Sequence, residues 1–271
     1  MNNLIIVRGG GDLATGTIYK LYQCGFPVLV LEVPNPSAIR RNVAFSEAVY
    51  EKKQTVEDVT CYLADSIADA ERLLAEEKLT MLADPVGEAI SRLKPLAVVD
   101  AILAKKNLGT CRAMAPITVA LGPGFEAGID VDAVVETQRG HNLGRVLWQG
   151  SAAPNTGIPG IIGGYGKERV IYSPAAGIVR NVCRITDTVK KGQTIAVIET
   201  GSETVPVHAT LDGLLRGLIR DGYPVTEHFK IADIDPRTGQ YRNCFTISDK
   251  SRCIAGGVIE AILHRKGALG L

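Results

Sequence analysis

The first 165 residues alternate short apolar runs with stretches of helical periodicity. The apolar runs predict β-strands over residues 4–7, 28–32, 80–83, 97–103, 117–121 and 133–137. One helix between them is clear, because Ile67, Ala70 and Leu74 recur at helical spacing after Asp65 or Ser66, either of which can cap it. Strands that alternate with helices build a mostly parallel sheet covered by helices. We therefore predict an α/β domain over residues 1–165.

A glycine-rich turn follows the first strand. Gly9, Gly11 and Ala14 fit the pattern G-x-G-x-x-G/A, whose positions serve the tight turn, the approach of a pyrophosphate and helix packing. Glu32 ends the second strand, where an acidic residue can accept hydrogen bonds from a ribose. The alternative is a turn that needs glycine without any ligand. We favour a Rossmann-like nucleotide-binding domain, with candidate residues Gly9, Gly11, Asp12, Ala14, Gly16 and Glu32.

Two later loops are further candidates. Gly122 and Gly124 follow the strand at 117–121, and this turn is either a second phosphate site or an ordinary loop. A polar loop follows the strand at 133–137, and open α/β sheets bind ligands at such strand ends. Its candidate residues for an anionic ligand are Glu136, Arg139, His141 and Arg145. The alternative is a solvated charged loop. Asp84 and Asp100 also end strands, where an aspartate often only caps a helix or forms a turn.

An internal repeat with a period of 36 residues follows the glycine- and proline-rich segment 154–168. Gly177 corresponds to Gly213 and Arg180 to Arg216, and each copy predicts strands separated by turns. Neither copy can bury its apolar face alone, so we expect the two copies to interlock. We predict a small all-β domain over residues 166–240, then a strand and a helix over 241–271 that pack back on the first domain.

This repeat resembles the barrel-sandwich hybrid fold of biotinyl and lipoyl carrier domains, on the strings 173–177 and 188–193. Carrier domains hold their modified lysine in the hairpin that joins the two halves. The corresponding segment here, 198–205, contains no lysine, so we expect neither biotin nor lipoate. The charged residues of 230–237 favour a structural ion cluster over a metal site, because Asp-x-Asp alone has too few ligands for a hard cation.

The composition narrows the function classes. Lysine plus arginine number 30 against 29 acidic residues, which gives no bulk charge for nucleic-acid or membrane binding. There is no signal peptide pattern and no apolar run long enough to span a membrane, so we expect a cytoplasmic protein. The six cysteines form no C-x-x-C pair and indicate neither a disulfide framework nor a zinc site. Hydrolase and Walker motifs are also missing, and catalytic residues stay unassigned.

The sequence resembles the YqeB family over nearly its full length. The resemblance rests on the strings 8–16, 122–125, 136–141, 155–160, 217–219, 233–237 and 247–250. It implies an accessory protein of selenium-dependent molybdenum hydroxylases, similar in role to XdhC-type maturation factors. The implied partner is a molybdenum hydroxylase, and the implied ligand is a nucleotide or a molybdopterin dinucleotide. The family supplies no catalytic residues to carry over.

Three hypotheses follow from the sequence. The first is a maturation factor that binds the molybdenum cofactor through the glycine turns and docks on its client through the β-domain. The second is an NAD(P)-dependent oxidoreductase, which Glu32 favours although no proton donor is evident. The third is a non-catalytic scaffold. The identity of the ligand separates them.

Overall fold

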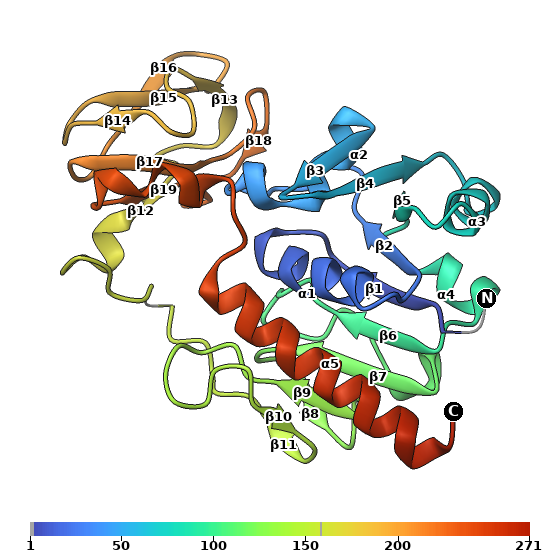
Figure 1. Ribbon diagram of the computed structural model, residues 1–271. Helices are drawn as coiled ribbons and strands as arrows, with labels where there is room; N and C mark the ends of the chain where they lie inside the picture. The colour runs from blue at the N-terminus through green and yellow to red at the C-terminus, as the bar shows by residue number, and fades with distance from the viewer. Residues whose placement is uncertain (1–2, 158) are drawn as a thin grey trace. The chain divides into compact units, whose positions relative to one another are not determined.

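The computed structural model describes residues 3–157 and 159–271. The chain forms two compact units (Figure 1). The first comprises the chain up to Pro36, Ala44–Thr156 and Ile247–Leu271, and the second comprises Ser37–Val43 and Gly157–Thr246. The chain passes from the first unit to the second after Thr156, whereas the predicted domain ended at residue 165.

The first unit is a mixed α/β structure built on a nine-stranded sheet of order β10-β9-β7-β6-β1-β2-β5-β4-β3. The strands are β1 Ile5–Arg8, β2 Val28–Glu32, β3 Lys53–Val56, β4 Val59–Ala64, β5 Leu79–Ala83, β6 Ala97–Asp100, β7 Ile117–Leu121, β9 Ala133–Val135 and β10 Val146–Leu147. The seven inner strands pair in parallel, and β3 and β10 are antiparallel edges. Strands β1, β2 and β7 are almost fully buried, as in sheets covered on both faces. A separate antiparallel pair is formed by β8 Glu126–Ala127 and β11 Gly150–Ser151.

Most predicted elements of this unit are present. The strands at 28–32 and 117–121 are confirmed to the residue, and the strand predicted at 97–103 ends at Asp100. The hairpin of β3 and β4 was not predicted, because β3 is an edge strand with mostly polar, partly exposed side chains. The helices are α1 Asp12–Gln23, α2 Ala48–Glu51, α3 Ile67–Ala75, α4 Glu88–Leu93 and α5 Asp249–Leu269. Of the two possible caps of α3, Ser66 is the one that accepts the Asp69 N–H, at 3.1 Å.

The C-terminal helix α5 packs against α1 in the first unit (Figure 1). A Cβ atom on Gly16 would lie 2.7 Å from Cβ of Ser251, so a glycine is needed for the two helices to meet. Ser248 caps α5 by accepting the Ser251 N–H at 3.1 Å. The strand predicted near the start of 241–271 is wrong, because a 3-10 helix over Thr238–Cys244 precedes α5 instead.

The second unit contains two four-stranded antiparallel sheets, β12-β19-β17-β14 and β16-β15-β13-β18. Their strands are β12 Val170–Tyr172, β13 Gly177–Asn181, β14 Thr188–Val189, β15 Thr194–Glu199, β16 Thr204–His208, β17 Gly213–Leu218, β18 Pro224–Val225 and β19 Lys230–Asp235. Strands β13, β14 and β15 begin 36 residues before β17, β18 and β19, so the internal repeat is visible in the structure. Strand β13 pairs with β18, and β14 pairs with β17, so the two copies exchange short strands across one apolar core.

A turn over 200–203 joins β15 and β16 in an antiparallel hairpin, within the segment 198–205 that contains no lysine. None of the helices in the described part of the chain combines the length and apolar character needed to cross a bilayer.

Candidate functional site

The candidate site lies at the carboxyl end of the parallel strands of the first unit. Strand β1 lies between β2 and β6 in the sheet. The chain runs from β1 through α1 to β2 on one side, and it returns later through α4 to β6 on the other side. The chain connections therefore leave β1 and β6 in opposite directions. In open α/β sheets such a reversal of strand order opens a crevice beyond the strand ends, and ligands bind there.

The three glycines after β1 have different environments. Gly9 has a φ of 94°, and a Cβ atom there would lie 2.9 Å from the carbonyl oxygen of Ala101. A Cβ atom on Gly10 would lie 2.8 Å from Cε of Met81. Gly11 has a φ of −64°, and no heavy atom of the described residues lies within 4 Å of where its Cβ would be. The fold accounts for Gly9 and Gly10, whereas Gly11 faces open space at the start of α1.

The remaining residues of the glycine motif serve packing. Ala14 is fully buried, as expected for the position that seats the helix on the sheet. Gly16 faces α5 rather than the crevice. Asp12 occupies the first turn of α1, and its carbonyl oxygen accepts a hydrogen bond from Ser251 Oγ at 3.1 Å. Among the predicted cofactor-binding glycines of this segment, Gly11 is the one that packing inside the protein does not require.

Glu32 lies beside the glycine turn. Its Oε1 accepts the Gly10 N–H at 2.9 Å and its Oε2 accepts the Val33 N–H at 2.6 Å. Burial raises the pKa of the Glu32 carboxyl, and the two backbone hydrogen bonds act in the opposite direction. Each carboxylate oxygen has a second lone pair, so Glu32 can accept a further hydrogen bond while it holds the turn.

The second glycine turn is explained by packing. A Cβ atom on Gly122 would lie 2.5 Å from Oγ1 of Thr137, and one on Gly124 would lie 2.6 Å from the backbone nitrogen of Lys106. Both glycines also have positive φ angles, of 73° and 108°. Of the two interpretations of this turn, the geometry favours the ordinary loop.

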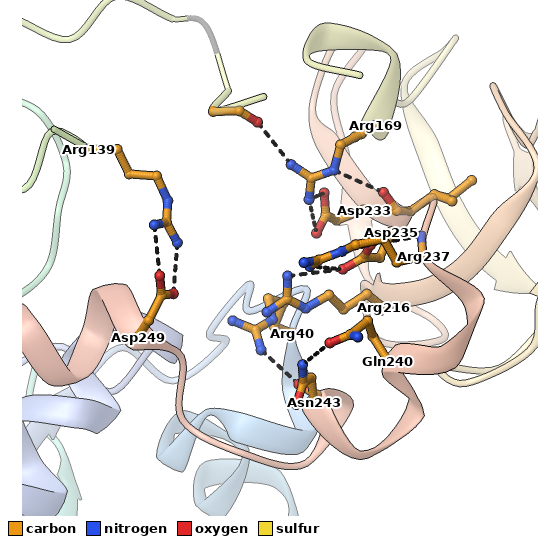
Figure 2. A network of polar contacts seen from close by, with 12 residues as sticks. Arg40, Arg139, Arg169, Arg216, Asp233, Asp235, Arg237, Gln240, Asn243 and Asp249 are labelled. Carbon is orange, nitrogen blue, oxygen red and sulfur yellow. Dashed lines mark hydrogen bonds and ion pairs between the residues drawn. The ribbon is translucent and has the colours of Figure 1, made fainter. Parts of the chain in front are cut away.

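The polar loop after β9 is fastened to the protein by Glu136. Its Oε1 accepts the Gln138 N–H at 2.7 Å and its Oε2 accepts the Ala153 N–H at 2.7 Å, so this buried carboxylate is structural. Arg139 makes two hydrogen bonds to Asp249 in the first turn of α5, at 2.8 and 2.9 Å (Figure 2). His141 and Arg145 are exposed.

Lys250 is a further candidate for the site, and the sequence analysis did not single it out. Burial lowers the pKa of its ammonium group and the charge of Arg139 lowers it further, whereas Asp12, Glu136 and Asp249 raise it. Lys250 therefore lies within electrostatic range of the start of α1 and of the polar loop. Sequence analysis did not assign Lys250 to the candidate site, because α1 and α5 are more than 200 residues apart in the chain.

A buried polar network lies at the ends of β1 and β6. Arg8 ends β1 and is paired in register with Asp100 at the end of β6. Thr110 Oγ1 accepts a hydrogen bond from Arg8 and donates one to Asp100, both at 2.5 Å, and all three residues are buried. Burial raises the pKa of the Asp100 carboxyl, against the opposing effects of Thr110, the Ile102 N–H and Arg8. Asp84 instead caps α4, because its carboxylate accepts the N–H groups of residues 87–89.

Metal binding has no geometric support within residues 3–157 and 159–271, where no three His, Cys, Asp or Glu side chains are grouped so that they could hold one ion. At the strand ends lie backbone N–H groups at the start of α1, the partly buried Glu32 carboxylate and the partly buried ammonium group of Lys250. These groups suit an anionic ligand that also carries hydroxyl groups.

Comparisons with known structures give only weak likeness. An aspartoacylase family protein from Mesorhizobium loti is 13% identical, with 86% of this chain and 84% of that one covered and a TM-score of 0.30. A succinylglutamate desuccinylase/aspartoacylase from Rhodobacter sphaeroides is 11% identical, with 86% and 85% covered and a TM-score of 0.27. TM-scores this low support no inference about the function of this chain.

Sequence comparison is more informative. No protein-family model matches the chain. The Escherichia coli (strain K12) protein YqeB is 49% identical over 262 residues, which are 97% of this chain and 48% of YqeB. The chain thus spans about half the length of this curated relative. At this identity over nearly every residue, the chain belongs to the YqeB family.

Proposed function

We propose that the first unit is a Rossmann-like domain that binds the pyrophosphate of a nucleotide at the start of α1. The observation that carries the proposal is Gly11, which faces open space with an ordinary φ at the helix start beside the β1–β6 crevice. A glycine that packing does not require is expected where a ligand's phosphate must approach the backbone. Glu32 at the end of β2 is placed for the ribose hydroxyls.

We further propose that the protein is an accessory factor of a molybdenum hydroxylase and that its ligand is a molybdopterin dinucleotide or a related nucleotide. The support is the family resemblance, since the YqeB-type strings 8–16, 136–141 and 247–250 all lie at the proposed site. The second unit is then a barrel-sandwich hybrid that docks on the client. Its exchanged strands support this fold, and its hairpin without lysine argues against a swinging-arm role.

Gly11→Val tests the pyrophosphate site. The branched side chain fills the space that the phosphate needs, so we expect at least a tenfold loss of affinity, about 1.4 kcal/mol, with an intact fold. The measurement is isothermal titration of the full chain with NAD, CTP and a molybdopterin dinucleotide. Gly267→Val is the matched control, because Gly267 also faces open space but lies near the far end of α5. Unchanged affinity in folded Gly11→Val would refute the site.

Lys250→Met tests the cationic side of the crevice. The ammonium group is partly buried near Asp12 and would make a charge-assisted hydrogen bond to a phosphate, so we expect affinity to fall about tenfold. Lys190, which is well exposed in the second unit, provides the control variant Lys190→Met. Equal affinities for both variants would remove Lys250 from the site.

An NAD-dependent oxidoreductase is the second candidate, and Glu32 is the observation that favours it. A carboxylate at the end of β2 accepts hydrogen bonds from the two free hydroxyls of an NAD ribose and repels the 2′-phosphate of NADP. The same titrations separate the candidates. Tight binding of NAD together with weak binding of the molybdopterin dinucleotide would move the oxidoreductase to first place.

A further inference from the structure

Arg8 at the end of β1 uses only part of its guanidinium group inside the protein. Its Nη1 donates to Thr110 Oγ1 at 2.5 Å and lies 3.8 Å from the Asp100 carboxylate. Its Nε and Nη2 make no hydrogen bond to the described residues, and neither is among the fully enclosed atoms that lack a partner. The 5% of Arg8 that stays accessible therefore includes these two nitrogens.

An equally buried arginine of the second unit provides a comparison. Arg169 is also 5% exposed. Its Nε donates to the Ile234 carbonyl, its Nη1 to the Gly160 carbonyl and its Nη2 to Asp233, so each nitrogen has an acceptor (Figure 2). In Arg8 the Nε–Nη2 edge has none. This is the edge through which a guanidinium group makes two parallel hydrogen bonds.

The open edge of Arg8 is held in place. Thr110 accepts from Nη1 and donates to Asp100 at 2.5 Å, so the side chain is anchored on β6. Strand β1 pairs Arg8 in register with Leu31, the residue before Glu32. Because Arg8 also directly precedes the glycine turn, its open edge lies at the same end of the sheet as the proposed nucleotide site. A donor pair fixed in advance loses little conformational freedom when a ligand binds.

The charges at this position favour a neutral ligand group over an anion. Asp100 is 2% exposed and balances the charge of Arg8. A bound anion would leave one net negative charge in a desolvated position, which is unfavourable. A neutral group with two adjacent acceptors leaves the balance unchanged. Arginine binds O6 and N7 of guanine in this way.

We propose that the Nε–Nη2 edge of Arg8 recognises the base of the bound nucleotide, and that this base presents a carbonyl oxygen beside an unprotonated ring nitrogen. Guanine offers O6 and N7, and cytosine offers O2 and N3. Adenine has no carbonyl oxygen, and in uracil a protonated N3 lies between the two carbonyl oxygens. The inference rests on the proposed nucleotide site and names the class of base that this site takes.

The test is isothermal titration of the full chain with GDP, CDP, ADP and UDP, which share the pyrophosphate and the ribose. We expect GDP and CDP to bind about tenfold more tightly than ADP and UDP. A GDP analogue with carbon in place of N7 should bind as weakly as ADP. These titrations use the unaltered protein, so the folding of a variant does not affect them.

Arg8→Lys tests the residue itself. Lysine keeps a cation beside Asp100 but lacks the two-donor edge, so the preference for GDP over ADP should disappear. Arg112→Lys is the matched control in the same unit, because Arg112 already directs its Nε and Nη2 to Asp132. This control should keep the preference of the parent. Thermal unfolding of both variants checks that they fold.

The outcomes separate this inference from the pyrophosphate site. Equal affinities for the four diphosphates, tight binding of the analogue without N7, or an unchanged preference in folded Arg8→Lys would overturn the role of Arg8 and leave the pyrophosphate site standing. Gly11→Val should weaken all four ligands alike and keep the preference for GDP over ADP. That preference without any loss of affinity in Gly11→Val would refute the pyrophosphate site alone. Failure of every diphosphate to bind would refute both.

Discussion

Gly257→Ala is expected to destabilise the protein by about 3 kcal/mol, which is the upper part of the usual range for overpacking. A Cβ atom on Gly257 would clash with the carbonyl oxygen of Gly144. The separation would be far shorter than the 3.0 Å that real Cβ atoms keep from other atoms. It would also lie 2.9 Å from Cγ1 of Val135. Backbone carbonyls yield less easily than side-chain ends, so α5 would have to move away from the polar loop.

The neighbouring residue is the control. A Cβ atom on Gly256 would meet no heavy atom of the described residues within 4 Å, and the residue lies within α5. Gly256→Ala should therefore stabilise the protein by about 1 kcal/mol, through the higher helix propensity of alanine. Urea unfolding of the two variants measures both effects. Equal midpoints for the two variants would show that α5 does not pack against the loop as described.

Asp100→Ala is expected to cost about 3–5 kcal/mol, because it leaves the buried Arg8 guanidinium without its carboxylate partner. Arg8 is 5% exposed and Asp100 is 2% exposed, and Thr110 links them by hydrogen bonds. A water molecule in the vacated space could accept hydrogen bonds but would supply no negative charge to balance Arg8. Chemical denaturation followed by far-ultraviolet circular dichroism measures the loss.

A surface ion pair provides the comparison for Asp100. Arg72 in α3 and Glu76 directly after it form an exposed i,i+4 ion pair at 2.6 Å. Exposed ion pairs of this kind contribute little to stability. Glu76→Gln should leave the denaturation midpoint nearly unchanged. The network of Arg8, Thr110 and Asp100 would be unimportant for stability if Asp100→Ala behaved like Glu76→Gln.

The sequence predicted elements whose signals are local. The strand at 28–32 is an apolar run, and the starts of α3 and α5 carry serine caps, so each is specified by neighbouring residues. The internal repeat could also be predicted from the sequence, because Gly177 and Gly213 are both needed at the same position of the repeated structure. A Cβ atom on Gly213 would lie 2.5 Å from the Asp235 carbonyl oxygen, and one on Gly177 would press on the Glu199 carbonyl oxygen.

The sequence did not predict features that depend on distant contacts. A glycine pattern alone cannot separate Gly11, which faces open space, from Gly122, which packs against Thr137. Lys250 becomes a candidate site residue only because α5 returns to the start of α1. The segment Ser37–Val43 follows β2 closely, yet it belongs to the second unit, where Arg41 donates to the Leu218 carbonyl at 2.8 Å.

The contact of Gly16 with Ser251 has a consequence for the order in which the protein is made. The first unit contains α1 but also needs α5, which follows the whole second unit along the chain. On the ribosome, α1 must wait for its partner while the whole second unit emerges. The second unit, complete once Thr246 has emerged, has every strand it needs before the first unit does. Synthesis of α5 is thus the step that lets it cover α1, and chains stalled before Asp249 would expose the apolar face of α1 to aggregation.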